Sequence, residues 1–357
     1  MKYRFGDIAT NITEKRAPKP EDKYNYIGLE HLDSGSLYVN RYGLDVEIKG
    51  DKLVMHKGDV LLGKRNAYLR RAAIAPHDGL FSAHGMILRP KENVVTNRFF
   101  PFFVASDKFF DEVIRISVGG LSPTVNWKDL KELEFNLPSL AEQKVLAEKL
   151  WAAYEVKQSY LRMIEATQEM VKSQFIEMFG TIDTPHYDTV TLTTISENLD
   201  SMRIPIKSGN RVDGQYPYYG ASGIVDYVGD YIFDDDILLI SEDGANLKDR
   251  VTPIAFSSSG KVWVNNHAHV LRFKDANLQR YVECYFNYNR IDKYLTGTAQ
   301  PKLNQDKLNS IPIPLPSGEV LTKFISIYNQ ADKSGFELRK SIDAIDKVIK
   351  SLINENL

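Results

Sequence analysis

The sequence contains a single cysteine, no long apolar run and almost no net charge, and each shortage excludes a class of protein. Cys284, alone among 357 residues, leaves no partner for an internal disulfide and no cysteine-rich zinc site. Its mostly apolar setting, YVECYF, indicates a buried thiol rather than a nucleophile. No apolar run approaches the length of a membrane span and the first ten residues are too polar for a signal peptide, so we expect a cytoplasmic protein without membrane contact.

The whole chain is nearly neutral, although two parts of it carry net charges of opposite sign. The formal net charge is −2, but residues 1–139 hold 21 basic against 18 acidic residues, whereas residues 181–316 hold 13 against 17. With 43% hydrophobic residues there is ample material for two cores. Any polyanion would therefore be met by local basic patches rather than by the field of the whole protein.

The common catalytic signatures are also missing. The sequence has no Walker A loop, no Asn/Asp-Pro-Pro-Tyr/Phe motif of amino-group methyltransferases, no His-Glu-x-x-His and no Gly-x-Ser-x-Gly. His267 and His269 are two apart on an expected strand, but no carboxylate or cysteine is in register, which favours framework histidines over a metal pair. We expect a chain that catalyses no reaction and binds no metal or cofactor itself.

Residues 139–180 are expected to form one long helix. Ser139 and Glu142 have the spacing of a capping box, and Gly180 can end the helix in the left-handed conformation. At about 1.5 Å per residue the helix would be roughly 60 Å long, more than one globular domain requires. Apolar residues follow steps of three and four, the period of a seam for a second helix. The expected seam residues are Leu150, Tyr154, Leu161, Ile164, Val171 and Phe175.

The chain repeats itself at an offset of 178 residues, which marks a tandem repeat. The matched residues are Gly119 and Gly297, Pro123 and Pro301, Asn126 and Asn304, Leu130 and Leu308, Pro138 and Pro316, and Ile164 and Ile342. Residues 317–357 are expected to form the second long helix, and its expected seam residues are Tyr328, Leu338, Ile342, Ile345, Ile349 and Leu352. The sustained heptads favour an antiparallel coiled coil between the two helices; the alternative is that each is an amphipathic helix lying on its own domain.

The segments that precede the two helices are predicted as domains of mixed α and β structure. Short apolar and β-branched runs bounded by Gly, Pro and Asp indicate strands, and residues 99–116 have the spacing of an aromatic core helix. Residues 236–239 echo residues 59–62, and residues 267–272 echo residues 84–89. The predicted fold class is α+β, with a first domain (1–139), a long helix (140–180), a second domain (181–316) and a second long helix (317–357) in a pseudo-twofold repeat.

The densest basic stretch, residues 63–71, is a candidate contact with a polyanion. Lys and Arg reach phosphates or guanine, Asn can pair with adenine, and Tyr can pack on a base. A solvated hairpin tip is the alternative, because short basic runs are common. Loops that differ between two copies of one framework favour the reading of different targets. The candidate residues are Lys64, Arg65, Asn66, Tyr68, Arg70 and Arg71.

The second copy offers two candidate contacts. The matching turn, residues 241–250, is more acidic, and carboxylates can accept a hydrogen bond from cytosine. Upstream, residues 207–223 form a polar and aromatic stretch that suits a contact loop or an Ω-loop packed on itself. The candidate residues are Lys207, Asn210, Arg211, Tyr218, Tyr219, Ser222, Glu242, Asn246 and Lys248.

This layout resembles the specificity subunit of a type I DNA restriction-modification system, over the entire chain. Residues 123–143 carry the resemblance most clearly, because they end in the Leu-Pro-x-Leu-x-Glu-Gln that opens the long helix in that family. Phe-Ile-Glu-Met-Phe-Gly at residues 175–180, and the stretches 216–223 and 237–246, add to it. The second copy departs from the pattern, since residues 315–320 lack the Glu-Gln and leave the start of that helix less well capped.

The resemblance implies a non-catalytic subunit that binds a bipartite sequence in double-stranded DNA. It would position two methyltransferase subunits, which use S-adenosylmethionine, and restriction subunits, which use ATP and Mg²⁺. The two domains would be target recognition domains and the long helices spacers between them. A coiled-coil scaffold that binds only protein partners is the alternative; DNA affinity that falls steeply with salt would separate the two.

Overall fold

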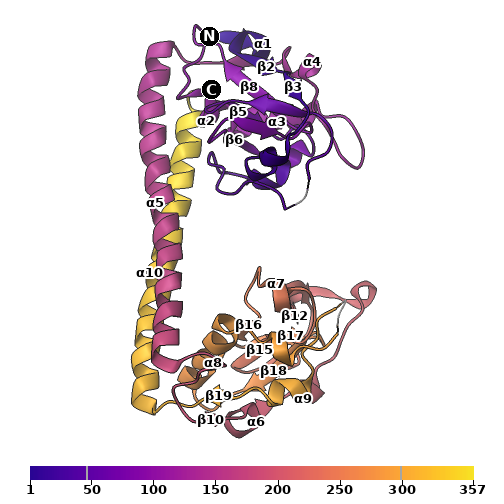
Figure 1. Ribbon diagram of the computed structural model, residues 1–357, viewed down its shortest axis with the longest axis vertical. Helices are drawn as coiled ribbons and strands as arrows, with labels where there is room; N and C mark the ends of the chain where they lie inside the picture. The colour runs from indigo at the N-terminus through magenta and orange to yellow at the C-terminus, as the bar shows by residue number, and fades with distance from the viewer. Residues whose placement is uncertain (46, 298–299) are drawn as a thin grey trace. The chain divides into compact units, whose positions relative to one another are not determined.

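The computed structural model describes residues 1–45, 47–297 and 300–357, and these divide into two compact units. Unit 1 comprises residues 1–161 together with 339–357, and unit 2 comprises residues 162–338. The division cuts both long helices, α5 (Leu140–Phe179) and α10 (Gly318–Asn354), so each unit contains one domain and part of each helix (Figure 1).

Unit 1 is built from small antiparallel sheets flanked by short helices. One sheet has the strand order β2-β8-β5-β6, a second has β3-β4-β7, and β1 pairs with β9. The strands are β1 (Lys2–Arg4), β2 (Ala9–Ile12), β3 (Lys15–Arg16), β4 (Lys52–Met55), β5 (Val60–Leu62), β6 (Ala72–Ile74), β7 (Gly79–Phe81), β8 (Met86–Pro90) and β9 (Glu134–Asn136). The helices are α1 (Phe5–Ile8), α2 (Phe100–Val104), α3 (Asp107–Arg115) and α4 (Trp127–Leu130), with 3₁₀ turns η1 (Pro20–Tyr24), η2 (Leu29–His31) and η3 (Ala67–Leu69).

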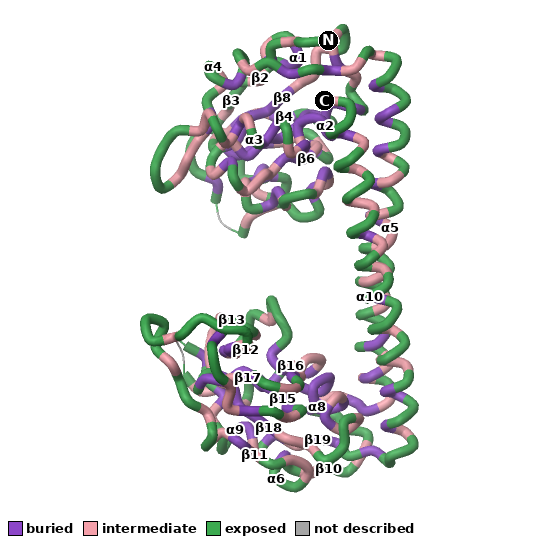
Figure 2. Tube along the Cα trace, turned by 180° about the vertical axis from the view of Figure 1, so that it is seen from behind, coloured by how far each residue is buried: buried purple, intermediate pink, exposed green. Residues whose placement is uncertain are grey.

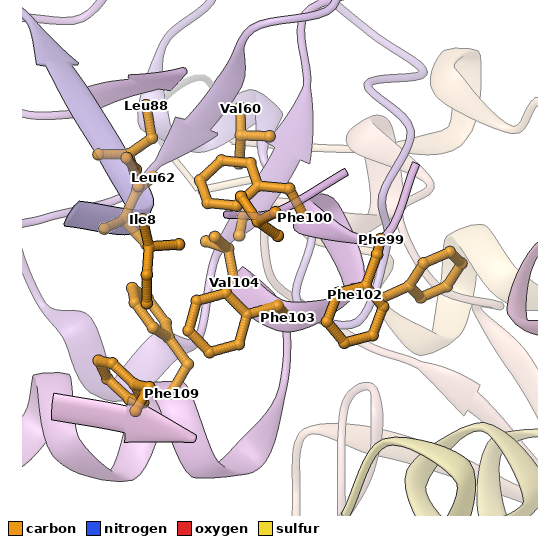
Figure 3. Packing of buried hydrophobic residues seen from close by; sticks show 14 of the residues in the cluster. Ile8, Val60, Leu62, Leu88, Phe99, Phe100, Phe102, Phe103, Val104 and Phe109 are labelled. Atoms are coloured by element: carbon orange, nitrogen blue, oxygen red, sulfur yellow. The ribbon is translucent and has the colours of Figure 1, made fainter. Parts of the chain in front are cut away.

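The core of unit 1 is aromatic, as the run of phenylalanines at residues 99–110 predicts. α2 is buried along its whole length, and Ser106 starts α3 by accepting a hydrogen bond from the Phe109 amide. Figure 3 shows the Phe100 ring beside Val60 and the Phe103 ring on the side of Phe109, and all four belong to one core cluster with Leu62 and Leu88 of the first sheet. Burial of each such ring stabilises the fold by about 1.5–3 kcal/mol, so the sheet and its helices form one rigid support for the turns between strands.

Unit 2 repeats this plan with a larger second sheet. The orders are β11-β18-β15-β16 and β13-β12-β17-β14, and β10 pairs with β19. The strands are β10 (Thr189–Val190), β11 (Glu197–Asn198), β12 (Asp213–Gly220), β13 (Gly223–Val228), β14 (Phe233–Asp234), β15 (Ile237–Ser241), β16 (Ala255–Ser258), β17 (Lys261–Val264), β18 (Ala268–Arg272) and β19 (Ile313–Pro314). The helices are α6 (Leu192–Ile195), α7 (Asn246–Asp249), α8 (Ala276–Tyr288) and α9 (Gln305–Asn309), with η4 (Asp200–Met202), η5 (Ser208–Asn210) and η6 (Asp292–Tyr294).

The strand pairing shifts one predicted correspondence between the two copies, that of residues 59–62 with residues 236–239, by a single residue. Val60 lies opposite Leu88 in unit 1, whereas the residue opposite Leu271 in unit 2 is Leu238. Since residues 84–89 match residues 267–272, Val60 corresponds to Leu238, not to Ile237. A shift of one residue exchanges the two faces of a strand, and both Val60 and Leu238 indeed face the main core of their unit.

Both long helices contribute to the core of each unit. In unit 1, Leu150 and Tyr154 of α5 are buried in the main core beside Ile353, with Ile349 and Leu352 of α10 packed against it. The Lys157 ammonium forms an ion pair with Asp346 at 2.7 Å. The beginning of α5 therefore lies beside the end of α10, which is antiparallel pairing.

In unit 2 the end of α5 meets the beginning of α10. The rings of Phe175 and Phe324 are 5.3 Å apart and edge to face, and Val171 and Tyr328 belong to the same cluster. The middle of the predicted seam is less covered: Ile164, Leu338 and Ile345 are half-buried, Ile342 is buried, and Leu161 is 43% exposed. Figure 2 shows residues 162–170 of α5 mostly in the exposed colour. The two sequence interpretations thus combine, because the helices pair and also lie on the domains.

Candidate nucleic-acid interface

In both units, the turn that follows the central strand of the first sheet is held against a hairpin by the same hydrogen bonds. In unit 1 the Asn66 amide donates to the Pro123 carbonyl at 2.7 Å, and the Val125 amide donates to the Lys64 carbonyl at 3.0 Å. In unit 2 the amides of Gly244 and Leu303 donate to the carbonyls of Pro301 and Glu242 at 3.1 and 2.7 Å. Every one of these residues is matched at an offset of 178, so the clamp belongs to the repeated framework.

The hairpin itself is also repeated. Val118 and Thr124 exchange two backbone hydrogen bonds, and so do Thr296 and Lys302. Within unit 1 the tip of this hairpin lies beside the basic turn, because the Arg65 guanidinium donates to the Ser122 hydroxyl at 3.2 Å. Leu121 at the tip is fully exposed. Neither Ser122 nor Leu121 is basic or aromatic, so sequence reasoning missed this hairpin; the matched Gly and Pro residues of the repeat were the available signal.

Three residues of the basic turn in unit 1 have side chains open to a partner. Arg65 and Tyr68 are exposed, and Lys64 is half-buried. Burial, together with the like charge of Lys15, lowers the pKa of the Lys64 ammonium. This part of the turn can present two cations and one ring to a polyanion.

Arg70 and Arg71 are instead bound within unit 1, although the sequence favoured them, like Asn66, as contact residues. Arg70 is in the left-handed conformation at the end of η3 and forms ion pairs with Asp107 and Asp111 of α3 at 2.7 and 2.6 Å. Arg71 donates to the Leu29 carbonyl at 3.1 Å. The buried Asn66 Oδ1 atom has no hydrogen-bond partner within the protein. The turn is therefore split between an outward part and an inward part.

In unit 2 the acidic turn also directs its charge inward. The Glu242 carboxylate forms ion pairs with Arg203 at 2.6 Å and with Lys302 at 3.1 Å. Its oxygens are therefore bound within the protein rather than open to a cytosine amine. Asp200 and His269 complete the cluster, with the His269 ring 2.6 Å from the Asp200 carboxylate. Arg203 and Lys302 were not among the predicted residues, because they are distant in sequence from the turn that they contact.

The remaining predicted residues of this turn differ in availability. Lys248 is exposed, whereas the Asn246 side chain is used by Thr252, donating to its carbonyl and accepting from its amide, both at 3.0 Å. Arg250 ends α7 in the left-handed conformation and donates to the carbonyls of Phe286 and Asn289 at the end of α8. Arg250 and Arg70 both follow a short helix in the left-handed conformation, but Arg250 donates to carbonyls and Arg70 to carboxylates, and at the offset of 178 Arg70 matches Lys248.

Residues 207–223 are largely a β-hairpin rather than a loop, because β12 pairs with β13 over most of its length. Tyr218 is buried, its hydroxyl accepts from the Ile206 amide, and the Arg211 guanidinium covers its ring at 4.4 Å. Arg211 also pairs with Asp226 at 2.9 Å. Alternation along a strand places successive side chains on opposite faces, which is why this aromatic stretch is partly core.

The exposed residues of this region are fewer than predicted. Lys207 precedes η5 and Asn210 ends it, and both are exposed, as is Ser222 between β12 and β13. Tyr219 is half-buried and stacks on Phe256 with ring centroids 5.7 Å apart. A contact surface in this region would therefore use Lys207, Asn210 and Ser222 rather than the tyrosines.

His267, just before β18, and His269, within it, each contact a carboxylate rather than a shared ion. His267 lies 2.8 Å from Asp243, and the second nitrogen of His269 faces the Leu303 carbonyl at 2.8 Å. Across residues 1–45, 47–297 and 300–357, no group of three metal-ligating side chains could hold a metal ion. In the same part of the chain no helix has the length and apolar character needed to cross a membrane.

The sequence matches one family model twice. Residues 1–159 and 186–344 each match the type I restriction modification DNA specificity domain. A Haemophilus influenzae protein assigned as a type I restriction enzyme specificity subunit, S.HindORF215P, is 37% identical over 137 residues, which are 38% of this chain and 35% of the relative. The EcoDI specificity subunit of Escherichia coli is 21% identical over 182 residues, 48% of this chain and 40% of the relative. These alignments cover well under half of either relative.

Solved structures share the fold over nearly the whole chain. The type I restriction-modification S subunit from M. genitalium aligns with a TM-score of 0.57 and 15% identity, covering 99% of this chain and 94% of that one. A chain from a structural study of complex assembly and conformational transition in the type I R-M system aligns with a TM-score of 0.56 and 17% identity, covering 100% and 97%. Together with the repeated family match, this places the chain in the family of type I restriction-modification DNA specificity subunits.

Proposed function

We propose that this chain is the subunit that reads DNA sequence for a type I restriction-modification complex, each domain reading one half of a bipartite target in duplex DNA. The observation that carries the proposal is the repeated clamp: both units hold a turn against a hairpin with the same hydrogen bonds, while the side chains on the turns differ. A framework that fixes two dissimilar turns is suited to reading two dissimilar half-sites.

The chain supplies recognition and geometry rather than catalysis. Two methyltransferase subunits would bring S-adenosylmethionine, and restriction subunits would bring ATP and Mg²⁺. Exposed apolar side chains on α5 support docking of such partners: Val145 and Val156 in unit 1 and Met163 and Met170 in unit 2 are 43–55% exposed. Helical ridges of this kind suit helix-to-helix packing with another protein. A subunit that reads chromosomal DNA would work in the cytoplasm.

A domain exchange tests the proposal directly. Residues 181–316 are replaced by the corresponding domain of a relative, and the methylated motif is determined by methylome sequencing of cells with the parent chain, the chimera or neither. We expect one half of the motif to change and the other to remain, because each domain has its own core. Methylation that does not depend on the chain, or a folded chimera that alters both halves, would refute this function.

A further inference from the structure

A pocket of about 280 Å³ lies in unit 1 where the basic turn, the β3 region and the start of α4 meet. One water molecule takes up about 30 Å³ in the liquid, so the pocket has room for a larger group. Lys15 and Lys64 both line it, together with Asn11, Thr13 and Asn126. Lys15 was not among the residues singled out from the sequence.

The lining of this pocket is cationic and contains no carboxylate. Lys15 and Lys64 are close enough for the charge of one to act on the other. Among the residues that the structure describes, no carboxylate lies within ion-pair distance of either ammonium. Asn126 stands at the start of α4, but its side chain makes no capping hydrogen bond, so its amide is open to a ligand. Two like charges beside polar amides form a favourable place for an anion.

Unit 2 shows what occupies the corresponding place there. Glu242 corresponds to Lys64, since the carbonyls of both accept the matched clamp hydrogen bond. Its carboxylate lies between the cations of Arg203 and Lys302, with His269 3.8 Å away. Unit 2 thus supplies an anion to its cations from its own chain. Unit 1 has Lys64 at that position and Thr124 in place of Lys302, and in the part of the chain that the structure describes no carboxylate pairs with Lys15 or Lys64, so the positive charge of the pocket is not balanced from within the unit.

We propose that the pocket lined by Lys15 and Lys64 binds a phosphoryl group, and that its source is a backbone phosphate of the DNA read by unit 1. This rests on the proposed function. The ammonium groups act as point charges without the planar fork that suits a guanine edge. Lys64 is half-buried and stands beside Arg65 in the turn, so a phosphate held there would fix the register of the duplex while Arg65 reaches outward.

The test uses the full chain and measures affinity for duplex DNA over a range of salt concentrations. The variants are Lys15→Gln, Lys64→Gln and the double variant, with Lys57→Gln as a matched control at an exposed lysine outside the pocket. Near-ultraviolet circular dichroism checks that each variant is folded. Because one phosphate is shared, the double variant should lower the slope of log affinity against log salt by roughly one, and each lysine variant should weaken all sequences alike.

Several outcomes would overturn the proposal. If the slope of log affinity against log salt is unchanged in the double variant, the two lysines do not contact a phosphate. If the slope falls by roughly two, they contact separate phosphates rather than sharing one in the pocket. A change at one base of the methylated motif in Lys64→Gln assigns that lysine to base reading. If inorganic phosphate, followed by ³¹P line broadening, binds the parent but not the double variant while the DNA slope stays unchanged, the source is free phosphate. If parent and control show no salt-dependent binding at all, the proposed function itself fails.

Discussion

The turns of the two units share a backbone and differ in how their charge is balanced. In unit 1 Lys64 and Arg65 follow the central strand, and Met86 of β8 lies in the apolar core. In unit 2 the matched positions hold Glu242 and Asp243, and the matched residue of β18 is His269, part of a nearly buried cluster of charges. The same framework therefore leaves the charge of one turn open and neutralises that of the other internally. Loop chemistry is thus free to vary once the clamp is fixed.

The largest expected loss of stability follows from disrupting the cluster of Arg203, Asp200, Glu242 and His269 in unit 2. Replacing Arg203 by alanine leaves the Asp200 and Glu242 carboxylates with fewer partners, and removing one member of a buried ion pair costs about 3–5 kcal/mol. Hydrogen exchange followed by mass spectrometry should show faster exchange of β18. An alanine at the exposed Arg65 should leave β8 unaffected. Equal exchange of β18 in parent and Arg203→Ala would show that the cluster is not needed for stability.

The next largest loss of stability is expected at Arg250, and it is compared with that at Arg70, the other arginine in the left-handed conformation. The Arg250 guanidinium donates hydrogen bonds to the carbonyls at the end of α8. Burial and the charge of Arg290 lower the pKa of this guanidinium to about 10. Arg250→Ala should cost about 2–3 kcal/mol by leaving buried carbonyls unsatisfied, whereas Arg70→Ala should cost at most about 1 kcal/mol because its ion pairs are partly exposed. Urea unfolding of both variants measures the difference. A larger cost at Arg70 would reverse the comparison.

The third prediction concerns the turn of unit 1 that holds Lys64 and Arg65, and it is tested by DNA affinity rather than by stability. Arg65→Ala should weaken DNA binding by about 1–3 kcal/mol and relax one base position if the guanidinium reads guanine, or weaken all sequences alike if it holds a phosphate. Fluorescence anisotropy with duplexes varied at each half-site distinguishes the two. The matched variant of unit 2, Asp243→Ala, serves as the control and should leave the first half-site unchanged.

The smallest effect is the response of unit 2 to acid. Burial raises the pKa values of the Asp200 and Glu242 carboxyls, but their hydrogen bonds and attraction to His269 and Arg203 outweigh burial and hold both below the usual range. The stabilisation is therefore present above the ordinary pKa values of about 4, and is lost as the pH falls through the lowered ones. Unfolding in urea between about pH 5 and pH 3 should show a shallower loss for Glu242→Gln than for the parent. Glu148→Gln on the exposed face of α5 is the control.

The periodic elements were predictable because each depends on residues near one another in sequence. The capping box forms as expected, with the Glu142 carboxylate accepting from the Ser139 amide at 2.8 Å. The helix ends at Gly180 with a φ of 77°, a conformation that costs glycine little. The burial of Tyr218 and the ion pairs of Arg70 were not predictable, because composition does not tell which face of a strand or turn is covered.

The sequence by itself determined the tandem repeat, the two long helices, the mixed sheets and the family. These follow from local spacing and from an offset that is readable without coordinates. Only the tertiary structure decided which charges are free, because an ion pair such as Arg203 with Glu242 joins residues 39 positions apart. It also brought Lys15 beside Lys64, and the electrostatic energy of such groups depends on separation and burial, which the order of residues does not record.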